Sequence, residues 1–95
     1  MKSTHIDPRA LNDLYRAILR LKTIDECKRF FRDIATLEEL KDLSDRWEVA
    51  RLIHTGVPYR TISQHTGVST ATITRVAHWI NHGEGGYQLM LKRIH

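Results

Sequence analysis

The most constraining stretch of this sequence lies between Tyr59 and Ile80, where a glycine separates two apolar-periodic runs. In the second run, apolar residues recur at i, i+3, i+4 and i+7, which is typical of the buried face of an α-helix. These residues are Ile73, Val76, Ala77 and Ile80. Gly67 can adopt the positive φ of a sharp turn, and Ser69 or Thr70 can cap the second helix. The range 59–80 therefore predicts a helix-turn-helix, a motif whose second helix enters the DNA major groove.

The outward face of the second helix carries small and cationic side chains and no carboxylate. An αα-hairpin without a DNA role would share the turn glycine, but this face favours base reading. Small side chains allow close approach to base edges, and arginine can bond guanine through two hydrogen bonds. We expect Arg60 to hold a phosphate and Arg75 to read guanine. The predicted DNA contacts are Arg60, Ser69, Thr70, Ala71, Thr72, Thr74, Arg75 and His78.

Charge and composition limit the classes of function that fit. The formal net charge of +4 on 95 residues favours a polyanionic partner. No paired carboxylates, nucleophile–base set or glycine-rich phosphate loop is present, so we do not expect an enzyme. Cys27, the single cysteine, cannot form an internal disulfide, which suits a reducing compartment. Since no signal peptide or membrane-length apolar run is found, we expect a cytoplasmic protein that does not bind membranes.

The remaining sequence predicts more helices, which gives an all-α fold of about six helices in one domain over residues 1–95. Asp7 and Pro8 are suited to begin the first helix, as cap and first helical residue. Thr23 with Glu26 forms a capping box, in which two side chains satisfy each other's free backbone N–H groups. Thr36 begins a second capping box. The expected ranges are 7–21, 24–34 and 37–55 before the helix-turn-helix, and 87–94 after it.

The long helix expected over 37–55 is apolar around most of its second half. Val49, Ala50, Leu52 and Ile53 cover most of the helical wheel there. A helix that is apolar nearly all round must be buried nearly all round. Short helices of one chain offer little surface for this, so we predict that a second copy covers the long helix in a homodimer. The alternative is a helix buried within one chain.

The string ATITR, Ala71 to Arg75, following a turn glycine, resembles the Trp repressor family. The layout is also similar: two N-terminal helices, a long helix, a helix-turn-helix and a short last helix. The segment GEGGY, Gly83 to Tyr87, is similar to the YerC/YecD-type branch. The resemblance implies an intertwined homodimer that reads pseudo-palindromic double-stranded DNA, with half-sites about 34–36 Å apart.

The resemblance also implies a possible effector pocket, because the repressor binds free L-tryptophan between two arginines as its corepressor. The matching residues are Arg46 and Arg75, and Thr36 matches the threonine that begins the long helix. Each also has a simpler role: Arg46 as a solvated charge, Arg75 as a DNA contact and Thr36 as a helix cap. Val76 replaces a glycine and Trp79 replaces a small serine of the repressor. We therefore expect Trp79 to fill part of the pocket and the protein to need no tryptophan or other cofactor.

Two further hypotheses concern residues near the end of the recognition helix. His78 and His82 lie four residues apart and could hold a metal ion. Without an acidic or thiol partner in the motif, we interpret them as a polar face near DNA and expect no metal site. The second hypothesis is that the helix-turn-helix docks a protein. Exposed Tyr59 and Trp79 would favour it, because aromatic residues anchor protein interfaces.

Overall fold

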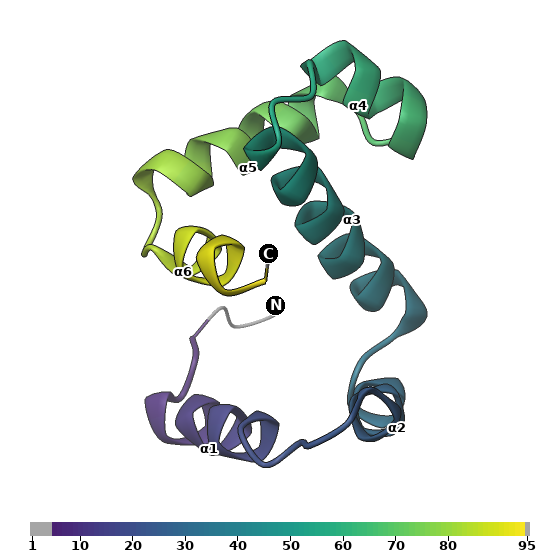
Figure 1. Ribbon diagram of the computed structural model, residues 1–95. Helices are drawn as coiled ribbons and strands as arrows, with labels where there is room; N and C mark the ends of the chain where they lie inside the picture. Colours follow the sequence, from purple (N-terminus) through teal and green to yellow (C-terminus); the bar gives the residue numbers. More distant parts are fainter. Residues whose placement is uncertain (1–4, 95) are drawn as a thin grey trace. The chain divides into compact units, whose positions relative to one another are not determined.

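The computed structural model describes residues 5–94, which form six helices and no strand (Figure 1). This confirms the all-α prediction. The helices are α1 (Pro8–Ile18), α2 (Ile24–Ile34), α3 (Leu37–His54), α4 (Tyr59–Thr66), α5 (Thr70–His82) and α6 (Gly86–Arg93). The chain divides at Leu37 into two compact units, the first with α1 and α2 and the second with α3 to α6. Over the described range, every helix is too short or too polar to cross a membrane.

The first helix begins where the sequence predicts and ends earlier. Asp7 caps α1 by accepting a hydrogen bond from the Arg9 N–H at 2.9 Å, and Pro8 is its first residue. The predicted end at residue 21 is wrong, because α1 stops at Ile18. Beyond it, Arg20 N donates to the carbonyl of residue 17, only three residues back. This tighter turn replaces the four-residue spacing of the α-helix and directs the chain toward α2.

The capping box before α2 forms with a shifted second half. The Thr23 hydroxyl accepts a hydrogen bond from the Glu26 N–H at 3.0 Å, as predicted. The Glu26 carboxylate accepts from the Lys22 N–H at 2.9 Å, one residue before the expected donor. The negative side chain still lies in the first turn of α2, where the helix dipole favours it.

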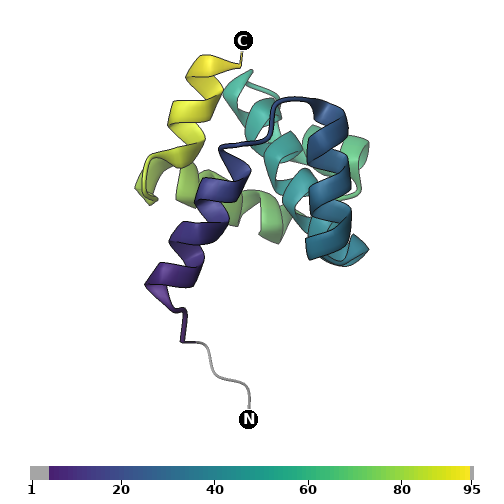
Figure 2. The ribbon, with the colours of Figure 1, turned by 90° about the horizontal axis from the view of Figure 1, so that it is seen from below.

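The apolar faces of α1 and α2 are at most half-buried, because neither helix contains a buried residue. The spacing of Cys27, Phe30, Phe31 and Ile34 at i, i+3, i+4 and i+7 predicts a core position for Cys27. In the structure Cys27 is half-buried and Ile34 is exposed. Within α2, the rings of Phe30 and Phe31 meet edge to face with centres 5.7 Å apart. Figure 2 shows α1 and α2 as separate helices joined by a short linker. These faces therefore gain little from burial in a single chain.

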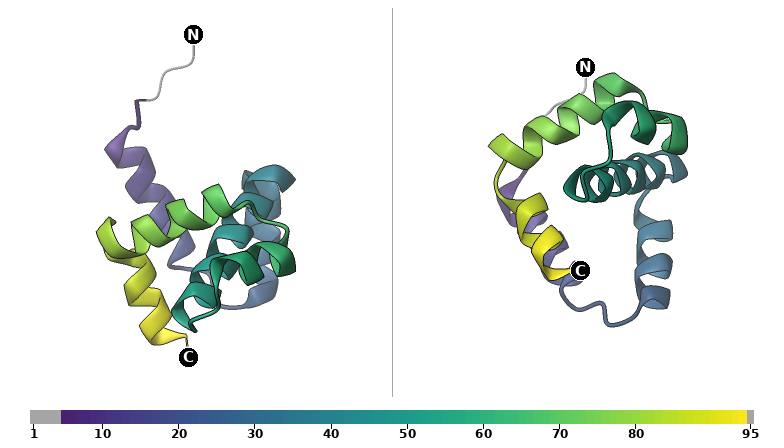
Figure 3. Two further views of the ribbon diagram at one scale, coloured as in Figure 1. Left: turned by 90° about the horizontal axis from the view of Figure 1, so that it is seen from above. Right: turned by 45° about the horizontal axis from the view of Figure 1, so that its top comes forward.

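The second unit has a core in which the helix-turn-helix packs against α3. A cluster of buried side chains from α3, α4, the turn and α5 forms this core. It consists of Val49, Ala50, Ile62, Val68, Ile73 and Val76. The right-hand view of Figure 3 shows α4 and α5 next to α3. The predicted inward face of α5 is confirmed, with Ile80 half-buried at its end.

The sequence predicts that a second copy covers the second half of α3, at Val49, Ala50, Leu52 and Ile53. This prediction is wrong for the first two residues. Val49 and Ala50 are fully buried within one chain, because Ile62 and Ile73 pack against this part of the helix. Leu52 and Ile53 are half-buried. In the first half of α3, Leu37 and Leu43 remain exposed at 66% and 50%.

A close turn joins α5 to α6, where the sequence suggests a flexible joint beginning at Asn81. Instead Asn81 is still helical, and its side-chain amide donates to the Ala77 carbonyl at 3.0 Å. Gly83 then donates its N–H to the Trp79 carbonyl at 2.9 Å. A Cβ atom at position 83 would lie 2.5 Å from that same oxygen, so the turn requires glycine.

The last helix is held against both of its neighbours in this unit. The Gln88 amide donates to the Ile80 carbonyl of α5 at 2.7 Å. The ring of Tyr87 stacks on Trp47 of α3 with centres 6.5 Å apart. The sequence predicts one apolar face for this helix, at i, i+3, i+4 and i+7 from Tyr87. Of its four residues, Leu91 alone is buried, Tyr87 is half-buried, and Met90 and Ile94 are exposed.

Candidate nucleic-acid interface

The turn between α4 and α5 is held by hydrogen bonds from a residue that the sequence reasoning missed. The Thr66 hydroxyl donates to the Ile62 carbonyl at 2.7 Å and accepts from the Val68 N–H at 3.1 Å. Gly67 adopts a φ of +77°, as predicted, and donates its N–H to the Ser63 carbonyl at 2.9 Å. In the sequence, a threonine directly before the glycine that ends a helix is the feature that could have indicated this role. These bonds set the direction in which α5 leaves the turn.

The start of α5 is capped by Ser69 rather than Thr70. The Ser69 hydroxyl accepts from the Thr72 N–H at 3.2 Å and lies 3.1 Å from the Thr72 hydroxyl. The Thr74 hydroxyl donates to the Thr70 carbonyl at 2.9 Å and keeps lone pairs free to accept. The first turn of α5 contains no acidic residue. Its positive dipole end is therefore not neutralised within the helix, which suits an anion such as phosphate.

The structure places the predicted DNA contacts on one continuous segment and at the start of α4. Arg60 lies in the first turn of α4, and the other seven lie between Ser69 and His78. All are exposed except Thr72, which is half-buried beneath the cap. The apolar neighbours Ile73 and Val76 are buried, so the two faces of α5 separate as the periodicity predicts.

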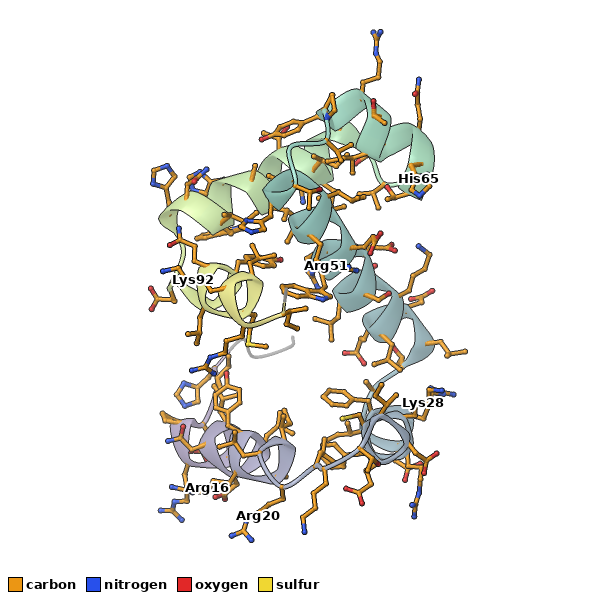
Figure 4. All side chains as sticks on the ribbon, viewed as in Figure 1. Arg16, Arg20, Lys28, Arg51, His65 and Lys92 are labelled. Carbon is orange, nitrogen blue, oxygen red and sulfur yellow. The ribbon has the colours of Figure 1, made fainter. Side chains whose placement is uncertain are left out.

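The electrostatic character of this part of the chain is positive. Residues 49–83 contain no aspartate or glutamate. Among residues 5–94, neither Arg60 nor Arg75 takes part in an ion pair, whereas Arg51 pairs with Glu48 at 3.3 Å. Figure 4 labels Arg51 on α3 and His65 near the end of α4. The two arginines of the helix-turn-helix are therefore free to meet phosphate or base oxygens.

Arg46 and Arg75 line one groove between α3 and α5, as the resemblance to the Trp repressor family implies. Its volume is about 330 Å³, and its wall is mostly polar. The lining residues are Asp42, Asp45, Arg46, Val68, Ser69, Thr72 and Arg75. Two aspartates in this wall were not predicted. A hydrogen bond from Lys41 to Asp45, at 2.6 Å, raises the pKa of Lys41 and partly neutralises one of them. Thr36 directly precedes α3.

The other two residues of the predicted effector pocket lie elsewhere. Val76 is 2% exposed and belongs to the core. Trp79 is 55% exposed and lines a second, apolar groove with Trp47, Tyr87 and Met90. The structure of one chain therefore does not bring Trp79 into the groove of Arg46 and Arg75.

Comparison with known proteins places this arrangement in a family. The family model described as Trp repressor protein matches residues 9–95. YerC of Bacillus subtilis (strain 168), a protein described as uncharacterized, is 44% identical over 84 residues. The match covers 88% of this chain and 81% of YerC.

Two crystal structures share the fold with a TM-score of 0.87 and 42% identity each. One, from Staphylococcus aureus, is provisionally described as a Trp repressor, and the match covers 93% of this chain and 88% of that one. The other is a TrpR-like protein from Eubacterium eligens ATCC 27750, and the match covers 90% of this chain and 89% of that one. The family match spans nearly the whole chain, and the helix-turn-helix lies within it. The chain therefore belongs to the Trp repressor family, a family of DNA-binding transcriptional regulators.

Proposed function

We propose that the protein is a homodimeric, sequence-specific regulator that represses transcription from pseudo-palindromic operators in the cytoplasm. The observation that carries this proposal is the exposed, carboxylate-free face of α5, which a capped turn holds in a defined direction. Ala71, Thr74, Arg75 and His78 are exposed on α5, and its buried side is fixed to α3. A rigid helix that presents short and cationic side chains is suited to the width of the major groove.

Affinity would come mainly from phosphate contacts. Arg60 has no ion pair within the described range and can neutralise one phosphate. The N-terminus of α5, capped by Ser69, can accept another between its backbone N–H groups. Each neutralised phosphate releases counterions, so binding should weaken steeply as salt rises.

Sequence discrimination would come from the next turn of α5. Thr70, Ala71 and Thr74 are short enough to approach base edges, and their methyl groups suit thymine. Arg75, one turn beyond Ala71, can donate two parallel hydrogen bonds to guanine O6 and N7. Phosphate contacts would position the helix, and these four residues would select the sequence.

A homodimer would provide the cover that the N-terminal helices lack. No residue of α1 or α2 is buried, and both helices have a clear apolar face. In α3, Leu37 and Leu43 are also exposed, at 66% and 50%. Exposed apolar surface of this extent is typical of a protein interface. Two copies would then place two recognition helices on one duplex, which explains a pseudo-palindromic site.

We propose further that this regulator does not require L-tryptophan. The groove of Arg46 and Arg75 also contains the carboxylates of Asp42 and Asp45, whose negative charges oppose a ligand carboxylate in the same groove. Val76, which replaces a glycine of the repressor, is buried in the core directly after Arg75 along α5. Its added volume supports the expectation that this part of the helix leaves less room for a ligand ring.

Selection from a random duplex pool, with and without L-tryptophan at near-physiological salt, tests the proposal. A palindromic motif enriched in both samples is the expected result. Enrichment only with L-tryptophan would restore tryptophan as a corepressor and contradict the argument from Asp42, Asp45 and Val76. No motif in either sample would count against sequence-specific regulation.

One observation favours a second function, a protein-docking module. Tyr59 and Trp79, at the two ends of the helix-turn-helix, are 42% and 55% exposed. Aromatic residues of this kind often anchor protein interfaces. Salt dependence separates the two functions, because duplex binding weakens steeply with salt and apolar docking does not. Salt-insensitive binding of one protein, with no duplex binding, would support the module.

A further inference from the structure

His78, one of the predicted DNA contacts, and His82, which is not among them, form a pair of imidazoles at the end of α5. Both side chains are exposed, and their ring centres lie 4.9 Å apart with planes inclined by 42°. Within residues 5–94, neither imidazole makes a hydrogen bond or ion pair. Their nitrogens are therefore available as ligands, and their exposed side chains can rotate about χ1 and χ2.

The separation of the two rings fits binding to one ion. A ligating imidazole nitrogen lies about 2.0–2.1 Å from the metal, which places the ring centre about 3.2 Å from it. Two such rings are about 4.5 Å apart, centre to centre, when the ligand angle is about 90°, and about 5.2 Å at a tetrahedral angle. The observed 4.9 Å lies between these values. Spacing of i, i+4 on a regular helix maintains this separation.

We propose that His78 and His82 chelate one divalent transition-metal ion that prefers imidazole, such as Ni²⁺ or Cu²⁺. Imidazole is a good ligand for both ions. Over the described range, no group of three or more His, Cys, Asp or Glu side chains is arranged to hold a metal. The two imidazoles would therefore leave the other coordination positions to water, unlike a closed structural zinc site.

The position of the pair on the helix also favours a cation. His82 lies in the last turn of α5, directly before Gly83. The C-terminal end of a helix carries partial negative charge on its free carbonyl groups, which stabilises a nearby cation. This proposal concerns the free protein and does not depend on DNA binding.

Calorimetric titration of the full-length, tag-free protein with Ni²⁺ tests the chelate, with fluorescence followed in parallel. We expect one ion per chain. The ring of Trp79 lies 5.1 Å from that of His78, so a paramagnetic ion there should quench its emission. Removing either imidazole turns a two-point chelate into a single ligand. His78→Ala and His82→Ala should each lower the affinity about tenfold or more.

The matched control is His65→Ala, which removes an exposed histidine from α4 and should leave Ni²⁺ affinity unchanged. Circular dichroism before titration shows whether each variant keeps its helices, and His82→Gln provides a second, polar replacement. Lowering the pH to 5 should weaken binding, because protonated imidazole cannot ligate. Absence of saturable binding below about 1 mM Ni²⁺ would overturn the proposal. Binding that survives in both His78→Ala and His82→Ala would also overturn it.

Discussion

Replacement of Arg75 by alanine is the sharpest test of how α5 would read DNA. The Arg75 side chain is exposed and, within the described residues, makes no ion pair. The side chains of α5 that pack in the core here are those of Ile73 and Val76, and Arg75 is not among them. The variant should therefore keep its fold, and any lost affinity can be assigned to DNA contact.

The expected loss follows from the geometry of guanidinium. A bidentate arginine–guanine pair contributes about 1–3 kcal/mol of discrimination, which is roughly a five- to 150-fold loss of affinity for the selected site. Binding to a scrambled duplex should fall much less. Arg75→Lys keeps the positive charge and loses the planar fork, so it should also lose most of the discrimination.

Fluorescence anisotropy with the selected and scrambled duplexes, over a salt series, measures both quantities. Arg60→Ala serves as the comparison, because loss of a phosphate contact should weaken both duplexes alike and reduce the salt slope by about 0.9. Arg51→Ala is the control, since Arg51 is paired with Glu48 on α3. Equal losses on both duplexes for Arg75→Ala would assign Arg75 to the phosphates. Unchanged affinity would place this face of α5 outside the groove.

Three further predictions concern stability, turn geometry and ligand binding. Ile73→Ala removes a fully buried side chain and should lower the free energy of unfolding by about 2–5 kcal/mol in urea titration; a loss below about 1 kcal/mol would contradict the described core. Gly67→Ala should cost about 1–2 kcal/mol in the same assay, because φ is +77° and no atom obstructs a Cβ there; an unchanged midpoint would contradict the left-handed turn. Calorimetry with L-tryptophan should show no saturable binding, and tight binding would contradict the argument from Asp42 and Asp45.

The helix-turn-helix was the part of the fold most accessible from sequence. The spacing of Ile73, Val76 and Ala77 defines one buried face, and Gly67 and Ser69 mark the turn and cap by their own chemistry. Local rules of this kind depend on few neighbours. The same is true of Asp7 before α1 and of Thr23 before α2.

Features that depend on distant neighbours were less accessible. Periodicity indicates that Val49 and Ala50 are buried, but not that α4 and α5 of the same chain cover them. The sequence shows that position 79 carries a large aromatic side chain, but it does not show the direction in which the Trp79 side chain points. The end of α5 lies at Gly83, whose N–H donates to the Trp79 carbonyl, and periodicity does not indicate which residue of the glycine-rich segment makes that bond.

The lack of any buried residue in α1 and α2 has a consequence for the life of the protein in a cell. On the proposed homodimer, a newly synthesised chain keeps these helices open to proteases until it meets a second copy. The waiting time shortens as copy number rises, because association depends on concentration. Sparse chains would be degraded and abundant chains would persist, so turnover would set a threshold of synthesis below which little regulator accumulates.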